Sequence, residues 1–76
     1  MIEKKRWLLV TFHTTAGAME METRCKAANL PGRLIPVPRS ITADCGMAWR
    51  AEIALRNKLA AVTADLDVDA LIELEI

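Results

Sequence analysis

Apolar residues near the start of the chain alternate with a period of two. The segment Trp7–Phe12 is aliphatic, β-branched or aromatic, and every second residue from Leu8 to Phe12 falls on one face. This pattern predicts a central strand whose apolar face meets the helices. Trp7 and Leu9 are then expected on the opposite, open face of the sheet.

The pattern next changes to the 3.6-residue period of a helix. His13, Thr14 and Thr15 precede it and supply groups that can cap a helix N-terminus. Leu30-Pro31-Gly32 ends it, because proline cannot continue a helix and glycine tolerates the turn that follows. The sequence therefore predicts a helix that runs to Asn29. Its inward stripe holds four residues at i, i+3, i+7 and i+10, namely Ala18, Met21, Cys25 and Ala28.

A second strand is predicted from Arg33 to Val37 or Pro38. Two prolines, Pro36 and Pro38, remove donors from its hydrogen-bonding ladder, so this strand belongs at the edge of the sheet. A loop over Arg39–Cys45 follows it.

Three further elements complete the chain. The segment Met47–Glu52 alternates apolar and mixed residues and predicts a third strand, and its sequence leaves open whether Trp49 faces the helices or the open side. A second helix is expected to reach Asp67, and a last strand is expected over Ala70–Ile76. The inward face of the second helix would hold Leu55, Leu59, Val62 and Leu66.

The order of these elements is βαββαβ, and it predicts an α+β fold. The expected architecture is a ferredoxin-like two-layer sandwich, with two helices on one face of a four-stranded antiparallel sheet of order 4-1-3-2. This topology puts the second strand at an edge, where its prolines also place it. A chain of 76 residues has room for one core, so residues 1–76 are expected to form a single domain.

Composition and charge narrow the functional classes. Ten basic and ten acidic residues give a net charge of zero, which removes the electrostatic term that drives binding to a phosphate backbone. We therefore expect no nucleic-acid partner. Trp7–Phe12 is the only apolar run near the start and is too short for a secretory signal or a membrane span, so we expect no membrane association. Two cysteines without a CxxC spacing favour the reducing cytoplasm.

The two cysteines differ in their sequence context. Cys25 lies in the inward stripe of a helix and is expected to be a small core residue. Cys45 precedes Gly46 in a loop, and the topology brings this loop towards the N-terminus of the first helix. Free N–H groups and the helix dipole at such an end lower a thiol pKa from its ordinary value of about 8.5. Cys45 is thus the candidate nucleophile.

The neighbours of Cys45 could assist or oppose this activation. His13, Thr14 and Thr15 at the helix start, with Gly46, are candidates for binding the transferred atom or its donor. Arg39 could steer an anionic donor or could simply be solvated, and the sequence does not decide between these roles. Asp44 would raise the thiol pKa if its carboxylate pointed inward.

Four motifs in the sequence are shared with a known family. They are Thr11-Phe12-His13-Thr14-Thr15, Ala18-Met19 with Glu22, Leu34-Ile35-Pro36-Val37-Pro38-Arg39 and Cys45-Gly46. Through these motifs the chain resembles the family of small domains described as putative selenium/sulfur (Se/S) carrier protein-like, and the resemblance covers nearly the whole chain. It implies a protein that holds sulfur or selenium on Cys45, as a persulfide or a selenium adduct, and passes it to an acceptor.

A carrier of this kind is expected to need a donor, such as a cysteine desulfurase or a selenium donor, and an acceptor protein. It is expected not to be an enzyme by itself. Cys25, Cys45 and His13 are too few and too irregularly spaced for a closed zinc site, so no metal is expected. No phosphate-binding glycine motif occurs in the sequence, and we expect no resident cofactor. The acidic residues 65, 67 and 69 are expected to form a solvated turn.

The alternative function is a protein-interaction or regulatory module that uses the open sheet face, with the cysteine incidental. Trp7, and Trp49 if it faces the same way, would make that face apolar, and an apolar face needs covering. A homodimer formed sheet to sheet would cover it. In that arrangement Arg50 would lie on the helix side or at its margin.

Overall fold

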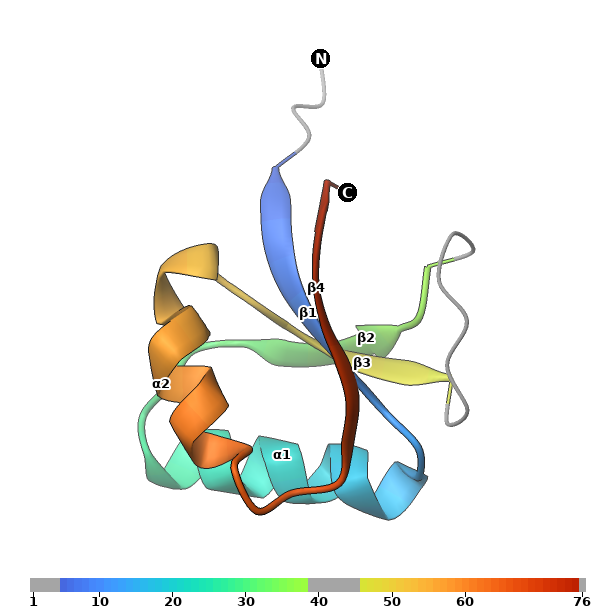
Figure 1. The fold of residues 1–76 in the computed structure, drawn as a ribbon, viewed down its shortest axis with the longest axis vertical. Coiled ribbons are helices and arrows are strands. Elements are labelled where there is room, and N and C mark those ends of the chain that lie inside the picture. The colour runs from blue at the N-terminus through green and yellow to red at the C-terminus, as the bar shows by residue number, and fades with distance from the viewer. Residues whose placement is uncertain (1–4, 39–45, 76) are drawn as a thin grey trace.

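A computed structural model of the chain describes residues 5–38 and 46–75. Within these residues, strands and helices follow the predicted order βαββαβ (Figure 1). A single turn of 3₁₀ helix, η1, precedes the second α-helix. The elements are β1 (Arg6–Phe12), α1 (Thr15–Ala27), β2 (Arg33–Pro36), β3 (Met47–Ala51), η1 (Ile53–Leu55), α2 (Arg56–Val62) and β4 (Val68–Glu75).

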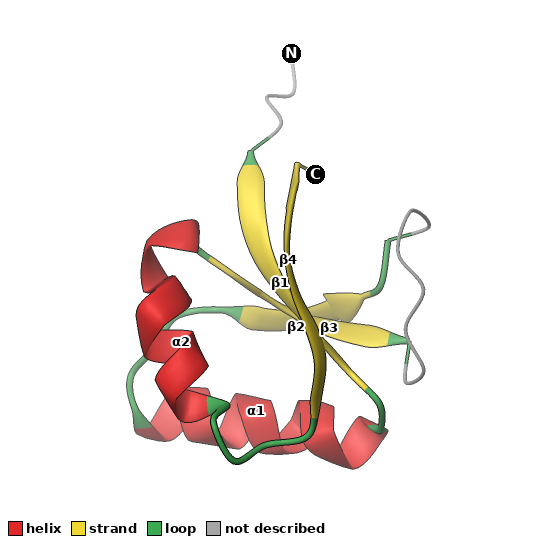
Figure 2. Cartoon of the chain, in the orientation of Figure 1, coloured by secondary structure: helices red, strands yellow, loops and turns green. Residues whose placement is uncertain are grey.

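The four strands form one open sheet in which all neighbours are antiparallel (Figure 2). Their order is β2-β3-β1-β4, which is 4-1-3-2 when it is read from the β4 edge. β1 is central, as its apolar pattern predicts, and β2 is at an edge, as its prolines predict. The prediction of a small α+β domain with one four-stranded antiparallel sheet and two helices is confirmed.

Helix α1 has a hydrogen-bonded cap at each end. The Thr14 hydroxyl accepts a hydrogen bond from the Gly17 N–H at 3.1 Å, which confirms the predicted N-cap. At the other end, Asn29 adopts a left-handed conformation with φ of 56°, and the Leu30 N–H donates to the Cys25 carbonyl at 2.8 Å. This is a Schellman closure. It ends the helix at Ala27, two residues before the predicted end.

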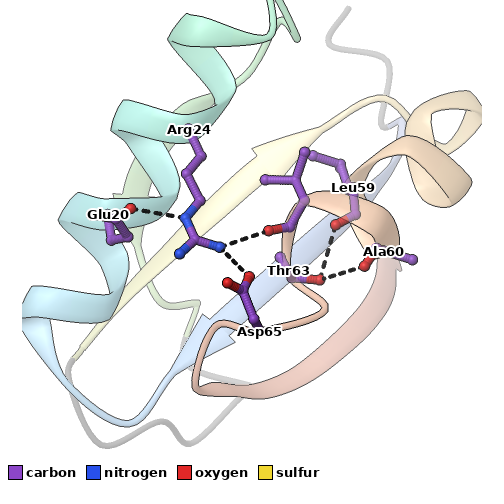
Figure 3. A network of polar contacts seen from close by, with 7 residues as sticks. Glu20, Arg24, Leu59, Ala60, Thr63 and Asp65 are labelled. Atoms are coloured by element: carbon purple, nitrogen blue, oxygen red, sulfur yellow. Dashed lines mark hydrogen bonds and ion pairs between the residues drawn. The ribbon is translucent and has the colours of Figure 1, made fainter.

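Helix α2 is much shorter than predicted, because side chains bind its last carbonyls. The Thr63 hydroxyl donates to the carbonyls of Leu59 at 2.9 Å and Ala60 at 3.2 Å. Arg24 of α1 donates to the Val62 carbonyl at 3.0 Å (Figure 3). The helix therefore ends at Val62, and the expectation that it reaches Asp67 was wrong.

Arg24 also joins α1 to the turn that precedes β4. Its guanidinium donates to Glu20 at 2.8 Å and to Asp65 at 2.5 Å (Figure 3). These hydrogen bonds lower the pKa of the Asp65 carboxyl and raise that of Arg24. Asp65 and Asp67 are exposed, as expected of a solvated turn, and Asp65 also joins that turn to α1. Asp69, which was expected in the same turn, lies on β4 instead.

The core lies between α1, α2 and one face of the sheet, and Trp49 belongs to it. Trp49 is 2% exposed and lies opposite Val10 on β1 and Leu34 on β2, so its indole faces the helices. The structure thereby settles the facing that the sequence left open. The buried cluster holds Leu8, Val10, Phe12, Ala18, Met21, Cys25, Trp49, Ala51 and Leu59.

The opposite face of the sheet is less exposed than expected. Arg50 lies there, opposite Leu9, so its placement on the helix side was wrong. Leu9 is fully buried, and Trp7 is half-buried with the Lys5 ammonium 4.5 Å and the Arg50 guanidinium 4.3 Å from its ring centre. Across residues 5–38 and 46–75, the large hydrophobic residue that stands out as exposed is Met19, on α1. Because Trp49 faces the helices and Trp7 is half-buried, the described residues do not present the uncovered tryptophan face from which the homodimer was predicted. The homodimer stays a prediction.

In the described part of the chain, neither helix has the length and apolar character that a membrane span requires.

Candidate functional site

The predicted site is at the end of the sheet where β1 stops and α1 begins. Thr11 on β1 lies opposite Ala48 on β3, which in turn lies opposite Ile35 on β2. His13 and Gly46 each come two residues beyond this row, in the same direction along the sheet. Strands lie about 4.8 Å apart. The start of α1 and the described end of the loop at Gly46 therefore share one end of the sheet (Figure 1).

The two ends of the connection between β2 and β3 are joined by strand pairing and by a backbone hydrogen bond. Pro36 lies opposite Met47, and the Val37 N–H donates to the Gly46 carbonyl at 3.0 Å. Gly46 is exposed and has a φ of 74°, a left-handed conformation that glycine adopts without strain. A Cβ at this position would meet no atom within 4 Å, so backbone conformation and not packing calls for glycine here.

Cys45, Arg39 and Asp44 lie outside the described residues. Their positions relative to α1 stay predictions, as do the roles given to them. The described residues on either side, Pro38 and Gly46, fix only where this segment leaves and rejoins the sheet.

The start of α1 offers a positive helix end that its own first turn does not neutralise. No acidic residue occurs in that turn. Thr14 is the N-cap and its hydroxyl already accepts from Gly17, while Thr15 begins the helix and is exposed. Of the three residues predicted here, Thr14 thus has a structural role, and nothing prevents Thr15 from contacting a ligand.

His13 lies beside two carboxylates that the sequence did not connect with it. Its Nε2 is 3.7 Å from Asp69 and 3.9 Å from Asp67, and its side chain is 42% exposed. Asp69 also accepts a hydrogen bond from the Thr11 hydroxyl at 3.3 Å. These contacts become ion pairs when the imidazole is protonated.

The two aspartates oppose the helix end electrostatically. A carboxylate disfavours a nearby thiolate and raises the thiol pKa, whereas a helix N-terminus lowers it. His13, when protonated, would partly neutralise Asp67 and Asp69. The alternating run 65-67-69 was visible in the sequence, but its proximity to His13 follows from the pairing of Phe12 with Val68, which the sequence does not reveal.

Cys25 is a free, fully buried residue in the core. Burial raises the pKa of its thiol. A neutral thiol without access to solvent is a poor nucleophile, so the prediction that Cys25 is a core residue is confirmed.

The described residues hold no metal-binding cluster. Within 5–38 and 46–75, no three histidine, cysteine or acidic side chains are grouped so that they could hold a metal ion.

Fold and sequence together define a class and then a family. The class is a small α+β domain with two helices, one buried thiol and a second cysteine in the β2–β3 connection. A family model described as "Putative Se/S carrier protein-like" matches residues 8–71 of the 76. The chain belongs to this family, as its motifs indicated, and the matched range includes both cysteines. Comparisons with curated proteins and with solved structures found no match.

Proposed function

We propose that this protein carries sulfur or selenium on Cys45 and delivers it to an acceptor protein. The observation that carries the proposal is the burial of Cys25. A chalcogen carrier needs a nucleophilic atom that can meet a donor, and Cys25 is fully buried with a raised thiol pKa. The chain has two cysteines, so a cysteine-based carrier of this family would use Cys45.

The chemical step is a thiol exchange that needs no external oxidant or reductant. The Cys45 thiolate attacks the outer sulfur of a donor persulfide, a new S–S bond forms on Cys45, and the donor's S–S bond breaks. The donor sulfur leaves as a thiolate with the electron pair of that bond. A donor that holds selenium on its thiol would transfer selenium in the same way, with an S–Se bond forming and another breaking.

The geometry around the β2–β3 connection supports this chemistry in part. The N-terminal end of α1 lies at the same end of the sheet as Gly46 and would favour a thiolate. Asp67 and Asp69 act in the opposite sense, and they lie 3.9 Å and 3.7 Å from the His13 Nε2. The thiol pKa of Cys45 is therefore the quantity that decides whether this end of the sheet activates it.

Several finer features belong to the same proposal. Element order and strand order support a ferredoxin-like sandwich. A labile persulfide and a free thiol suit the reducing cytoplasm. The donor would be a cysteine desulfurase or a selenium donor, the carrier would have no turnover of its own, and no cofactor would be bound.

The experiment compares two single-cysteine proteins, Cys25→Ala and Cys45→Ser. Each is incubated with a cysteine desulfurase and cysteine, and intact mass is read with and without a reductant. Cys25→Ala should gain one sulfur atom that the reductant removes. Cys45→Ser should gain none, with an unchanged circular dichroism spectrum showing that it is folded.

Alkylation of the same two proteins across pH measures activation directly. Cys45 should react with an apparent pKa below about 8.5, while Cys25 should react only when the fold opens. Sulfur gain by Cys45→Ser, or a normal or raised pKa at Cys45, would contradict the proposal. A normal or raised pKa at Cys45, together with no sulfur gain by Cys25→Ala, would favour the alternative of an interaction module in which the cysteine is incidental.

A further inference from the structure

A second candidate site lies at the other end of the sheet, away from the β2–β3 connection. A pocket of about 240 Å³ opens there between the start of β1, the start of β2 and the end of β3. Trp7, Arg33, Arg50 and Glu52 line it, together with the Pro31-Gly32 turn. The pockets that hold drug-sized ligands measure about 300–1,000 Å³, so this pocket suits a smaller molecule.

Two arginines on neighbouring strands line this pocket. Arg33 on β2 and Arg50 on β3 are direct partners in the antiparallel register, so their side chains leave the same face of the sheet. Like charges in directly opposite positions of an antiparallel pair are destabilising. A pair of this kind calls for an anion that compensates it.

No carboxylate of the described residues supplies that compensation. Among the ion pairs of residues 5–38 and 46–75, none includes Arg33 or Arg50. Glu52 is nearby, but its Oε1 accepts a hydrogen bond from the Lys5 ammonium at 2.7 Å. Lys5 and the two arginines therefore leave an excess of positive charge around the pocket.

Arg50 also carries a donor without an acceptor. Its Nε is buried and has no hydrogen-bond partner in the described part of the chain. Its guanidinium is held over the Trp7 ring, 4.3 Å from the ring centre. The stacking on Trp7 is therefore kept at the expense of this hydrogen bond, and it fixes the guanidinium at the wall of the pocket.

We infer that Arg33 and Arg50 bind the oxyanion head of a small organic acid. The head is a carboxylate or a phosphate, because the guanidinium fork matches both groups in bidentate geometry. The remainder of the ligand packs against Trp7 and Pro31, which supply an aromatic and an apolar wall. This site lies at the opposite end of β3 from Gly46, and it does not depend on the carrier function.

The test is a titration followed by NMR, with inorganic phosphate, phenyl phosphate and benzoate as probes. The indole N–H of Trp7 and the Nε–H of Arg50 report on the pocket. Both signals should shift saturably, and phenyl phosphate should bind more tightly than inorganic phosphate because its ring contacts Trp7. Comparison of phenyl phosphate with benzoate identifies the preferred head group.

Arg33→Gln is the decisive variant, because Arg33 is exposed on an edge strand and its loss should not disturb the fold. It should weaken binding about tenfold or more, as expected for a charge-assisted hydrogen bond. The matched control is Arg56→Gln, which removes the same charge from α2 and should bind as the parent does. The absence of saturable shifts with all three probes would overturn the inference. So would equal affinities of the two variants.

Discussion

The position of Trp49 predicts a specific cost for placing alanine at Gly32. A Cβ built on Gly32 would lie 2.5 Å from Nε1, 2.6 Å from Cε2 and 2.7 Å from Cζ2 of Trp49. Real Cβ atoms do not approach other heavy atoms this closely, so something must move. The indole is rigid and 2% exposed, so it has little room to shift.

The expected magnitude follows from this overlap. Extra atoms forced into a packed core typically cost about 1–3 kcal/mol. A core of this size contributes on the order of 3–5 kcal/mol in total, so Gly32→Ala removes a large fraction of the free energy of unfolding. The midpoint of thermal unfolding should fall by about 4–8 °C for each kcal/mol lost.

Urea unfolding followed by circular dichroism measures this cost, and the other two glycines provide matched controls. In Gly17→Ala the new Cβ would lie 3.4–3.7 Å from its neighbours, an ordinary contact, so a better helix former should leave stability unchanged or raise it by up to about 1 kcal/mol. In Gly46→Ala the space is open but φ is 74°, so backbone strain should cost about 1–2 kcal/mol.

Asparagine substitutions distinguish steric overlap at Gly32 from backbone strain at Gly46. Asparagine tolerates left-handed backbone better than alanine, so Gly46→Asn should recover part of the stability that Gly46→Ala loses. Gly32→Asn should be at least as damaging as Gly32→Ala, because it adds more atoms against the indole. If Gly32→Ala unfolds within 0.5 kcal/mol of the parent, roughly the range of neutral surface substitutions, Trp49 does not lie against Gly32 and its inward facing is refuted.

Three other predictions concern the helix cap and the shifted pKa values. Thr14→Ala should lower the free energy of unfolding by about 0.5–2 kcal/mol in urea, because Gly17 loses its capping acceptor. The hydrogen bond from Arg24 lowers the pKa of the Asp65 carboxyl. This pair therefore stabilises the fold fully when the pH is above the ordinary carboxyl pKa of about 3.9, and the stabilisation is lost as the pH falls through the lower pKa of the folded protein. The urea midpoint of the parent should exceed that of Asp65→Asn at pH 7, and the difference should shrink in acid. Burial raises the pKa of the Cys25 thiol, so the fold binds this proton more tightly than the unfolded chain does. In a Cys45→Ser background, the free energy of unfolding should therefore keep its full contribution from Cys25 below about pH 8.5 and lose it as pH rises above that value. Urea titrations at about pH 7 and pH 10 should show this decline, and the same protein with Cys25→Ala should not show it.

The parts of the fold that local sequence could predict are those with one dominant signal. Alternation from Leu8 to Phe12 marked the central strand, and the prolines after Arg33 marked the edge strand. The end of α2 had no such signal, because it depends on Arg24, a residue 38 positions before Val62 in the chain. No window of sequence around α2 contains that contact.

The facing of Trp49 was undetermined for a related reason. β3 reads Met-Ala-Trp-Arg-Ala, with small or long residues on both faces, so a period of two does not distinguish them. The choice is made by tertiary partners, namely Val10 and Leu34 beside the indole and Gly32 against its edge. Gly32 was interpreted from the sequence as a turn residue, whereas in the structure its φ is not positive and its missing side chain leaves room for the indole.

In the candidate site, too, local features were predictable from the sequence and features set by tertiary contacts were not. The cap at Thr14 could be read from sequence, whereas the aspartates beside His13 could not. Their position follows from the irregular pairing of β4 with the end of β1, where the register shifts between Thr11 and Phe12. A one-residue change in that register would alter which side chains of β4 lie beside His13.

Gly46 and the arginine pocket are separated by the length of β3. Gly46 precedes this strand and Arg50 lies near its end, four residues later, a separation of about 13 Å at 3.3 Å per residue. A small acid held between Arg33 and Arg50 therefore cannot contact a group at Gly46. Arg33→Gln should leave sulfur loading and the alkylation profile of Cys45 unchanged, and Cys45→Ser should leave anion binding unchanged. Each proposal can consequently fail while the other stands.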